Sequence, residues 1–236
     1  MIREHEEEEV QLLSNVHIFE SLSKEEIRDL LRQNLEIRLQ QGEILYTPWE
    51  HNGNLFVLKK GRMRIYRTEG THEFTVDVVD AGSVFGERAF TPFRLRKSYA
   101  QAIVPSVVFV MECAAVERLI LEKPTVGIRM IRLLSERLDY YETRMEDVTL
   151  KGVPARLASL ILFLVQSEGV QCSGEIRIPI HYTHRHLGTM IGANREAVTR
   201  AFGQLQDDGA VQIRRRMIHI IDLEALENSA GRFLDE

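Results

Sequence analysis

The spacing of apolar positions changes along the chain, and each change predicts a different kind of element. Ser23-Lys24-Glu25-Glu26, followed by apolar residues at helical spacing, predicts a capped short helix after a frayed acidic tail at 6–9. Between about 35 and 113, short apolar runs alternate with glycines, which is typical of strands joined by tight turns. Such runs occupy 42–46, 55–58, 63–66, 74–79 and 107–111. Many short strands at regular spacing predict an antiparallel, jelly-roll-like β-roll.

A long helix with a different apolar pattern is predicted after Pro124. Its apolar residues alternate in spacings of three and four, the a/d heptad pattern of helices that pair with each other. The predicted seam consists of Ile131, Leu134, Leu138, Tyr141, Met145 and Val148. Lys151-Gly152-Val153-Pro154 interrupts the pattern and predicts a hinge. We therefore expect a helix and β-roll over 1–115, a dimerisation helix over 116–151 and a second domain over 152–236.

The second domain contains the pattern of a helix-turn-helix. Thr183 and Asn194 are each placed to cap a helix, and Gly192-Ala193 supplies the turn between the two helices. Apolar residues at 198, 202 and 205 predict the buried face of the second helix. Its N-terminal end, where a recognition helix meets base edges, carries Arg195, Glu196, Thr199 and Arg200. Arginine can bond guanine with two donors, and glutamate can accept from cytosine.

A basic hairpin follows the second helix. Strand-like runs at 211–213 and 217–221 flank Arg214, Arg215 and Arg216, which predicts a wing whose tip lies on the DNA backbone. The alternative is an exposed helix with ordinary salt bridges among Arg195, Glu196 and Arg200. The adjacent hairpin argues against that alternative, and the intact set of three argues against a ligand-binding or scaffold module with a degenerate second domain.

Charge and composition narrow the class of protein. The 236 residues are 44% hydrophobic and 28% charged, with a net charge of −5. This excess of acidic residues argues at first against nucleic acid, but the segment 176–221 has seven arginines against three acidic residues. No apolar stretch approaches the ~20 residues of a membrane span, and the start does not resemble a secretory signal. Cys113 and Cys172 lie far apart and form no metal spacing. We expect a cytoplasmic protein without a metal site.

From about Phe19 to Leu226 the chain resembles the Crp/Fnr family of bacterial transcription regulators. The resemblance rests on Gly42, Gly61, Gly82, Phe85-Gly86-Glu87, the long helix and the segment Ile191–Arg200, which is similar to the family's Gly-x-x-Arg-Glu-x-x-x-Arg recognition motif. It implies an α+β fold with a cyclic-nucleotide-binding-type β-roll, a dimerisation helix and a winged helix-turn-helix. It also implies a non-enzymatic homodimer on a palindromic promoter, with Arg195, Glu196 and Arg200 contacting bases. Activation through RNA polymerase is the family's commoner mode.

The resemblance also implies a sensor pocket. In members that bind cyclic nucleotides, a Gly-Glu pair and a later arginine hold the ribose and the phosphate, and Gly86, Glu87 and Arg96 match them. Lys97 stands where Ser or Thr is usual, and Tyr141-Glu142 replaces the Thr-Ser pair that holds adenine. These departures argue against cyclic AMP in the usual pose.

Arg137 and Glu142 suggest a second effector. An Arg and a Glu five residues apart on this helix resemble the pattern of the family's 2-oxoglutarate-sensing nitrogen regulators. In a parallel dimer, however, the two occupy g and e positions and could simply pair across the seam, which we favour. The effector is therefore open between a cyclic nucleotide, a 2-oxoglutarate-like anion and no ligand at all.

Other cofactors fit the sequence less well. An iron–sulfur cluster needs four cysteines, and the family's haem members place Cys and His ligands where this chain has Gly86-Glu87-Arg88. His72 and Cys113 are isolated. His184 and His186 fall on the first helix of the helix-turn-helix, where we expect them to face DNA phosphate or solvent. A cupin-like enzyme would need several histidines inside the roll, and the strand region offers only His51 and His72.

Overall fold

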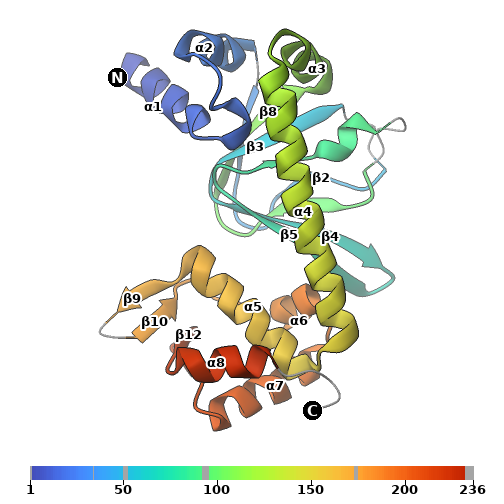
Figure 1. Cartoon of the computed structure of the whole chain (residues 1–236), viewed down its shortest axis with the longest axis vertical. Helices are drawn as coiled ribbons and strands as arrows, with labels where there is room; N and C mark the ends of the chain where they lie inside the picture. Colours follow the sequence, from blue (N-terminus) through green and yellow to red (C-terminus); the bar gives the residue numbers. More distant parts are fainter. Residues whose placement is uncertain (1, 34, 50–52, 92–95, 173–174, 232–236) are drawn as a thin grey trace. The chain divides into compact units, whose positions relative to one another are not determined.

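The computed structural model describes residues 2–33, 35–49, 53–91, 96–172 and 175–231 (Figure 1). It forms two compact units, Met1–Leu138 and Asp139–Glu236. The boundary falls within one long helix, so the three-part division expected from the sequence stays a prediction. His51 lies outside the described residues. None of the described helices is long and apolar enough to cross a membrane.

The first unit contains α1 (Ile2–Ser14), η1 (His17–Phe19), α2 (Lys24–Gln33), β1 (Leu35–Leu39), β2 (Ile44–Tyr46), β3 (Asn54–Lys60), β4 (Arg62–Glu69), β5 (His72–Asp80), β6 (Val84–Phe85), η2 (Glu87–Phe90), β7 (Tyr99–Ala102), β8 (Ser106–Glu112), α3 (Cys113–Glu122) and the first part of α4 (Pro124–Leu150). The second contains the rest of α4, α5 (Val153–Glu168), β9 (Val170–Cys172), β10 (Glu175–Ile178), α6 (His184–Ile191), α7 (Arg195–Asp207), β11 (Val211–Arg214), β12 (Met217–Ile220) and α8 (Leu223–Ala230).

The β-roll predicted from the sequence is confirmed. Two four-stranded antiparallel sheets form it, in the orders β1-β8-β3-β6 and β2-β7-β4-β5. Strand β3 is buried along most of its length rather than alternately. Phe56 and Leu58 belong to the core cluster of the roll, whereas Leu55 and Val57 belong to a second cluster with residues of α1, α2 and α4. Because both faces of β3 are covered, its sequence shows a continuous apolar run.

The N-terminal segment differs from the frayed tail expected from its acidic residues. It forms α1, because Val10 and Leu13 bury their side chains in the second core cluster. Glu9 pairs with Lys59, which is only 8% exposed and also binds Glu36. The glutamate run therefore lies on a packed helix, where tertiary contacts outweigh the low helix stability of a short acidic segment.

The capping box before α2 is confirmed. Ser23 Oγ accepts a hydrogen bond from the Glu26 amide at 3.3 Å, and Glu26 Oε2 accepts from the Ser23 amide at 2.8 Å. Glu26 also pairs with Lys123. The hydrogen bond from Lys123, followed by that from the Ser23 amide, lowers the pKa of Glu26 to about 2.

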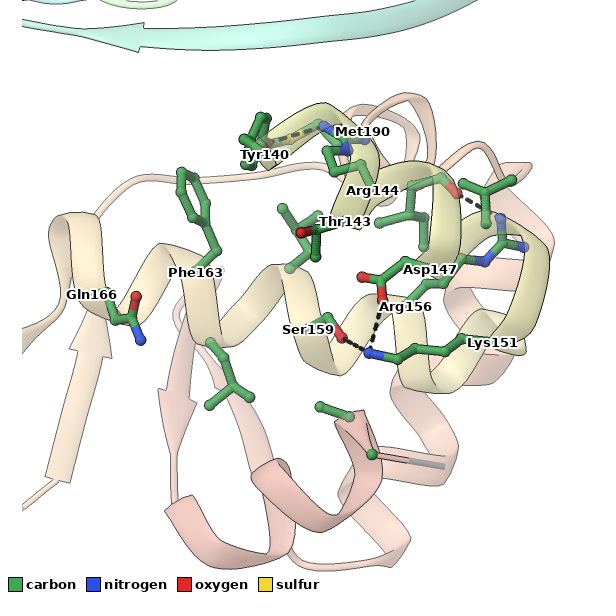
Figure 2. Close-up of a pocket in the computed structure, with 16 residues that line it drawn as sticks. Tyr140, Thr143, Arg144, Asp147, Lys151, Arg156, Ser159, Phe163, Gln166 and Met190 are labelled. Carbon is green, nitrogen blue, oxygen red and sulfur yellow. Dashed lines mark hydrogen bonds and ion pairs between the residues drawn. The ribbon is translucent and has the colours of Figure 1, made fainter. Parts of the chain in front are cut away.

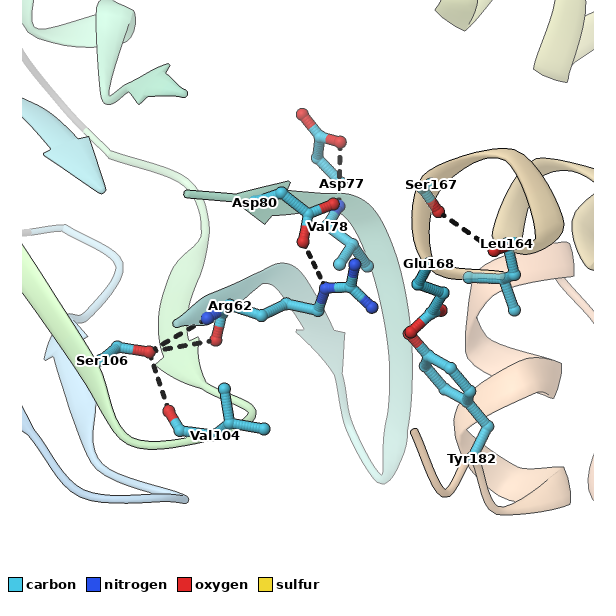
Figure 3. A network of polar contacts seen from close by, with 10 residues as sticks. All are labelled: Arg62, Asp77, Val78, Asp80, Val104, Ser106, Leu164, Ser167, Glu168 and Tyr182. Carbon is cyan, nitrogen blue, oxygen red and sulfur yellow. Dashed lines mark hydrogen bonds and ion pairs between the residues drawn. The ribbon is translucent and has the colours of Figure 1, made fainter. Parts of the chain in front are cut away.

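The turn between β3 and β4 shows why one glycine of the pattern is required. Gly61 has φ +96°, and a Cβ there would lie 2.6 Å from the Pro105 carbonyl oxygen. The Arg62 amide next to it donates to Ser106 Oγ at 3.2 Å, and the Arg62 side chain pairs with Asp80 (Figure 3). Any side chain at Gly61 would push β4 away from Ser106.

The seam of the long helix is largely uncovered in the single chain. Exposed fractions are 61% for Ile131, 41% for Leu134, 56% for Leu138, 68% for Met145 and 49% for Val148, and Tyr141 is half-buried. The predicted helix after Pro124 is confirmed as α4, but residues 116–151 are not one helix, because α3 ends at Glu122. Pro124 cannot continue the hydrogen-bonding of a preceding helix, so it begins a new one.

Candidate DNA-binding surface and effector residues

The two helices of the predicted helix-turn-helix begin and end where their capping residues stand. Thr183 Oγ1 accepts from the His186 amide at 3.1 Å, and Asn194 Oδ1 accepts from the Ala197 amide at 2.8 Å. Between them Gly192 has φ +65°. Gly188 is also constrained, because a Cβ there would lie 2.5 Å from the Ala193 carbonyl oxygen. These contacts confirm both caps and the turn.

Helix α7 has one buried face and one exposed face, as the spacing predicts. The buried side chains are Val198, Ala201, Phe202 and Leu205. The four residues expected to contact DNA, Arg195, Glu196, Thr199 and Arg200, are all exposed. They lie in the first two turns of the helix, whose N-terminal amides favour phosphate groups. The exposed face therefore presents two guanidiniums, a carboxylate and a hydroxyl to whatever approaches this end of α7.

The first residue of α6, His184, packs against α7 next to this exposed face. His184 Nδ1 lies 2.8 Å from Thr199 Oγ1, and the His184 ring stacks on Phe202 with centroids 4.9 Å apart. Burial, and then the charge of Arg195, lowers the pKa of His184. The His184 ring is half-buried against α7, whereas His186 is exposed, and contact of either histidine with DNA phosphate stays a prediction. Sequence spacing did not reveal this contact.

The predicted wing is a two-residue hairpin in a small sheet of order β11-β12-β10-β9. Arg214 pairs with Met217, so the turn consists of Arg215 and Arg216, with φ +51° and +64°. Two positive φ angles in a two-residue loop define a type I′ turn. Arg214 lies in β11 rather than at the tip, and its guanidinium donates to Glu175 Oε2 at 2.9 Å. The tip therefore presents two arginines rather than three.

In the first unit, the residues expected to hold an effector contact other protein groups. Arg96 is 2% exposed; its Nη2 donates to the Asn54 carbonyl at 2.6 Å, and its guanidinium lies 4.1 Å from the centre of the Tyr46 ring. Burial lowers the pKa of Arg96 and raises that of Tyr46. Gly86 has φ +91°, and a Cβ there would lie 3.1 Å from Arg96 Nη1. Gly86 thus lets its backbone approach the buried guanidinium.

Arg137 of α4 contacts the same loop. Its Nη1 donates to Glu87 Oε2 at 2.8 Å, and its other terminal nitrogen donates to the Val84 carbonyl. Arg137 therefore already has a carboxylate partner in its own chain, and its pairing with Glu142 of a second chain stays a prediction. Lys97 and Glu142 are exposed, and Tyr141 contacts the Tyr140 ring. Their part in ligand binding also stays a prediction.

No group of three or more His, Cys, Asp or Glu side chains that could hold a metal ion occurs among the described residues. Cys113 is buried, Cys172 is exposed, and neither forms a disulfide.

Comparison with known families identifies both halves of the chain. Residues 36–123 match the cyclic nucleotide-binding domain, and residues 155–229 match the Crp-like helix-turn-helix domain. The chain is a Crp/Fnr family regulator. The matches cover the β-roll with Gly86, Glu87 and Arg96 and the helix-turn-helix with Arg195, Glu196 and Arg200, in the order expected from the sequence. Proteins of this class are DNA-binding transcription regulators, so the cupin-like enzyme alternative is set aside.

Curated relatives of this regulator span nearly its whole length. One is the "CRP-like cAMP-activated global transcriptional regulator" of Mycobacterium tuberculosis, 24% identical over 221 residues, which are 93% of this chain and 99% of the relative. Another is the "Global nitrogen regulator" of Synechocystis, 28% identical over 189 residues, 79% of this chain and 84% of the relative.

Solved structures show the same fold. A transcriptional regulator of the CRP/FNR family from Thermus thermophilus superposes with a TM-score of 0.72 at 20% identity, covering 84% of this chain and 99% of the other. A CooA mutant from Carboxydothermus hydrogenoformans superposes with a TM-score of 0.74 at 21% identity, covering 86% and 90%. At these identities the likeness establishes the fold of the Crp/Fnr regulator and not its effector.

Proposed function

We propose that this regulator binds a palindromic promoter site as a homodimer and contacts bases in each half-site through Arg195, Glu196 and Arg200. The observation that supports this most directly is the exposure of these three side chains at the N-terminal end of α7. Arginine and glutamate at this position match the donor and acceptor pattern of the major groove. The wing arginines, Arg215 and Arg216, would neutralise phosphates beside the groove.

The dimer is supported by the uncovered heptad seam of α4. Its a and d residues are apolar but about half exposed in the single chain, whereas the same pattern in a coiled coil is buried by the partner helix. A two-fold dimer would place two copies of α7 about one DNA turn apart, roughly 34–36 Å. Because a two-fold axis relates the two copies, the site should be a palindrome. A promoter-bound protein would work in the cytoplasm, as the composition predicts.

A small anion in the β-roll is our proposal for the effector, and activation through RNA polymerase is our proposal for its output. Two guanidiniums, Arg96 and Arg137, lie at the Gly86-Glu87 loop, and Arg137 comes from the dimerisation helix. A cyclic nucleotide or a 2-oxoglutarate-like anion has the charge that this pair would bind. Such a ligand would act through its difference in affinity for the two states, typically ~1–3 kcal/mol of coupling.

A ligand-independent regulator is the second candidate, because the same residues are already bonded. Glu87 is paired with Arg137, and Arg96 is held by the Asn54 carbonyl and the Tyr46 ring. An effector would have to compete with the Glu87–Arg137 ion pair. If none does, this ion pair would fix the loop to the dimerisation helix permanently.

DNA selection and calorimetry test the proposals separately. Selection of random duplexes by the full chain should enrich a palindrome, and enrichment of sites without two-fold symmetry would contradict the homodimeric mode of binding.

Titration of the ligand-free protein with cyclic AMP, cyclic GMP and 2-oxoglutarate should give heat with one of them. Arg137→Gln should weaken that binding, whereas Arg132→Gln, at an exposed position of the same helix, should not. No heat from any of the three, with full DNA binding, favours the ligand-independent regulator.

A further inference from the structure

A cavity of about 490 Å³ lies within the second unit, among the last turns of α4 and the helices α5, α6 and α8 (Figure 2). Its volume is within the roughly 300–1,000 Å³ typical of small-molecule sites. The effector residues discussed above, Gly86, Glu87, Arg96 and Arg137, all belong to the first unit. The cavity is therefore a separate candidate site, formed by the DNA-binding unit itself.

One end of the cavity is apolar. Phe163 and Leu160 of α5 contribute to its wall together with Met190 of α6. The Tyr140 ring of α4 lies beside Phe163, with centroids 5.8 Å apart and the planes tilted by 38° (Figure 2). Aromatic and aliphatic walls of this kind favour the apolar body of a ligand, because its burial releases water from both surfaces.

The other lining residues carry an excess of positive charge. Lys151 Nζ lies 2.8 Å from Asp147 Oδ1 and donates to Ser159 Oγ at 3.1 Å, so this pair is neutral (Figure 2). Arg144 and Arg156 are different. Neither forms an ion pair with a carboxylate in the part of the chain that the structure describes, although the charge of Asp147 also acts on Arg156.

The contacts of these two arginines leave bonding capacity for a ligand. Arg144 Nη1 donates to the Tyr140 hydroxyl at 3.2 Å, and Arg156 Nη1 donates to the Ile191 carbonyl at 2.9 Å. Arg156 Nε is buried and has no hydrogen-bond partner among the described residues. A buried charged donor without a partner is costly, and burial lowers the pKa of the Arg156 guanidinium. An anion nearby would relieve both effects.

We propose that this cavity binds a small amphipathic anion, with its acidic head group near Arg144 and Arg156 and its apolar body against Phe163 and Leu160. Aliphatic carboxylates and aromatic sulfonates belong to this class. The anionic head supplies further acceptors for the two guanidiniums, and the apolar body fills the space that water occupies less favourably.

Dimerisation through the seam would cover one side of the cavity. With Leu138 at heptad position a, the lining residues Val148 and Arg144 occupy d and g positions at the seam, whereas Tyr140 and Asp147 occupy c positions and Thr143 occupies an f position. Positions c and f lie away from the a/d seam. A partner helix would therefore cover the Val148 side and leave the wall formed by Tyr140, Thr143 and Asp147 uncovered.

A bound ligand would bridge parts of the unit that the hinge separates. It would contact α4 before the hinge at Lys151-Gly152 and, after the hinge, both α5 and α6, the first helix of the helix-turn-helix. A ligand that prefers one arrangement of these helices shifts the population of that arrangement. This regulatory consequence rests on the proposed DNA binding, whereas occupancy of the cavity does not.

Two threonines of α4 provide a matched pair of variants for testing occupancy. Both are exposed, and each donates to a carbonyl four residues earlier: Thr143 to Asp139 at 3.0 Å and Thr149 to Met145 at 2.8 Å. Only Thr143 lines the cavity. Thr143→Trp should fill part of the space, and Thr149→Trp should leave it unchanged.

Anilinonaphthalene sulfonate, whose fluorescence rises in apolar sites, is the probe for the full-length protein. Its affinity should fall about tenfold or more in Thr143→Trp and stay within about twofold in Thr149→Trp, where tenfold is 1.4 kcal/mol. Equal affinities in the two variants would overturn the site. Circular dichroism and the melting temperature confirm that both variants are folded.

The charge of the ligand is tested by competition. Decanoate should displace the probe at about tenfold lower concentration than decanol, and Arg144→Gln should remove most of that difference. If the acid and the alcohol compete equally in the wild type, the preference for an anion is wrong.

A DNA-binding assay then distinguishes the proposed regulation from occupancy of the cavity. Decanoate should change the affinity of the wild type and of Thr149→Trp for the selected palindrome, but not that of Thr143→Trp. Displacement of the probe without any change in DNA affinity would overturn the regulatory step alone. A wild type that binds no DNA at all would contradict the proposed function and leave the ligand result intact.

Discussion

His184 Nδ1 lies 2.8 Å from Thr199 Oγ1, and this contact joins the first helix of the helix-turn-helix to the exposed face of the second. Thr199 Oγ1 also donates to the Arg195 carbonyl at 2.9 Å. The Thr199 hydroxyl is therefore fixed between two partners before DNA arrives. A side chain held in this way loses less conformational freedom on binding than a free one.

The partial burial of His184 should make the stability of the second unit depend on pH. Burial lowers the pKa of His184 from its ordinary 6.5, so the unfolded chain takes up the proton more readily than the folded one. The contribution of His184 to the free energy of unfolding is then fully present above about pH 6.5. It falls as the pH drops through the window between the pKa of His184 in the unfolded chain and its pKa in the folded chain.

His184→Phe should keep the stacking on Phe202, lose the contact with Thr199 and remove this pH dependence. The difference in melting temperature between variant and wild type should move in favour of the variant as the pH falls from about 8 to about 5. His181→Phe, at an exposed position before α6, is the control. A difference for His184→Phe that stays constant with pH would show that His184 does not titrate in this range.

Base recognition is tested by a pair of arginine variants. Arg200→Ala should cost about 1–3 kcal/mol of specific binding and relax the preference at one base pair in each half-site. Arg215→Ala should weaken all sequences alike and reduce the slope of log K against log salt by about one, because it removes a phosphate contact. Binding assays on the selected palindrome and on its single-base variants, at several salt concentrations, measure both. If Arg200→Ala bound its site as tightly as the wild type, α7 would not be the recognition helix.

The elements of the second unit could be predicted well from the sequence because their signals are local. Thr183 and Asn194 cap helices through amides three residues away, and the buried face of α7 follows directly from helical spacing. The folding of α1 was missed because it depends on Val10 and Leu13 reaching a core assembled from distant strands. An acidic segment alone gives no sign of such a core.

Contacts between distant residues were also beyond the sequence. Arg137 and Glu87 are 50 positions apart. The heptad positions predict a different partner for Arg137, namely Glu142 of the partner helix. The run of three arginines predicts Arg214 at the tip of the wing, but the strand register places it in β11, where it contacts Glu175. In both cases the charged side chain pairs with a group that only the tertiary structure brings near. The spacing of residues along the chain therefore does not predict the partner.

The dimer seam is tested by one substitution at two heptad positions. Leu138→Asp places two like charges opposite each other in an apolar seam and should dissociate the dimer, and promoter binding should be lost with it. Leu150→Asp is the matched control, because Leu150 is 49% exposed compared with 56% for Leu138 but occupies an f position away from the seam. Light scattering of both variants measures the assembly. A stable dimer of Leu138→Asp would show that α4 does not pair through this seam.

The wing should show a conflict between stability and DNA binding. Its two-residue turn requires positive φ at Arg215 and Arg216. Residues other than glycine and asparagine adopt positive φ at a cost of order 1 kcal/mol or more each. Asn-Gly is the preferred sequence for this turn. The double variant Arg215→Asn, Arg216→Gly should therefore stabilise the second unit by about 1–2 kcal/mol, which thermal unfolding measures.

The same double variant should bind DNA more weakly, because it removes both tip charges while keeping the shape of the hairpin. The slope of log K against log salt should fall by about two. Arg215→Asn combined with Arg216→Lys, which restores one charge, should recover about half of that slope and lose the part of the stability gain that comes from Arg216→Gly, because lysine at positive φ is as unfavourable as arginine. A stabilised double variant with unchanged salt dependence would mean that the tip does not touch DNA. The strained turn would then have to serve something other than phosphate binding.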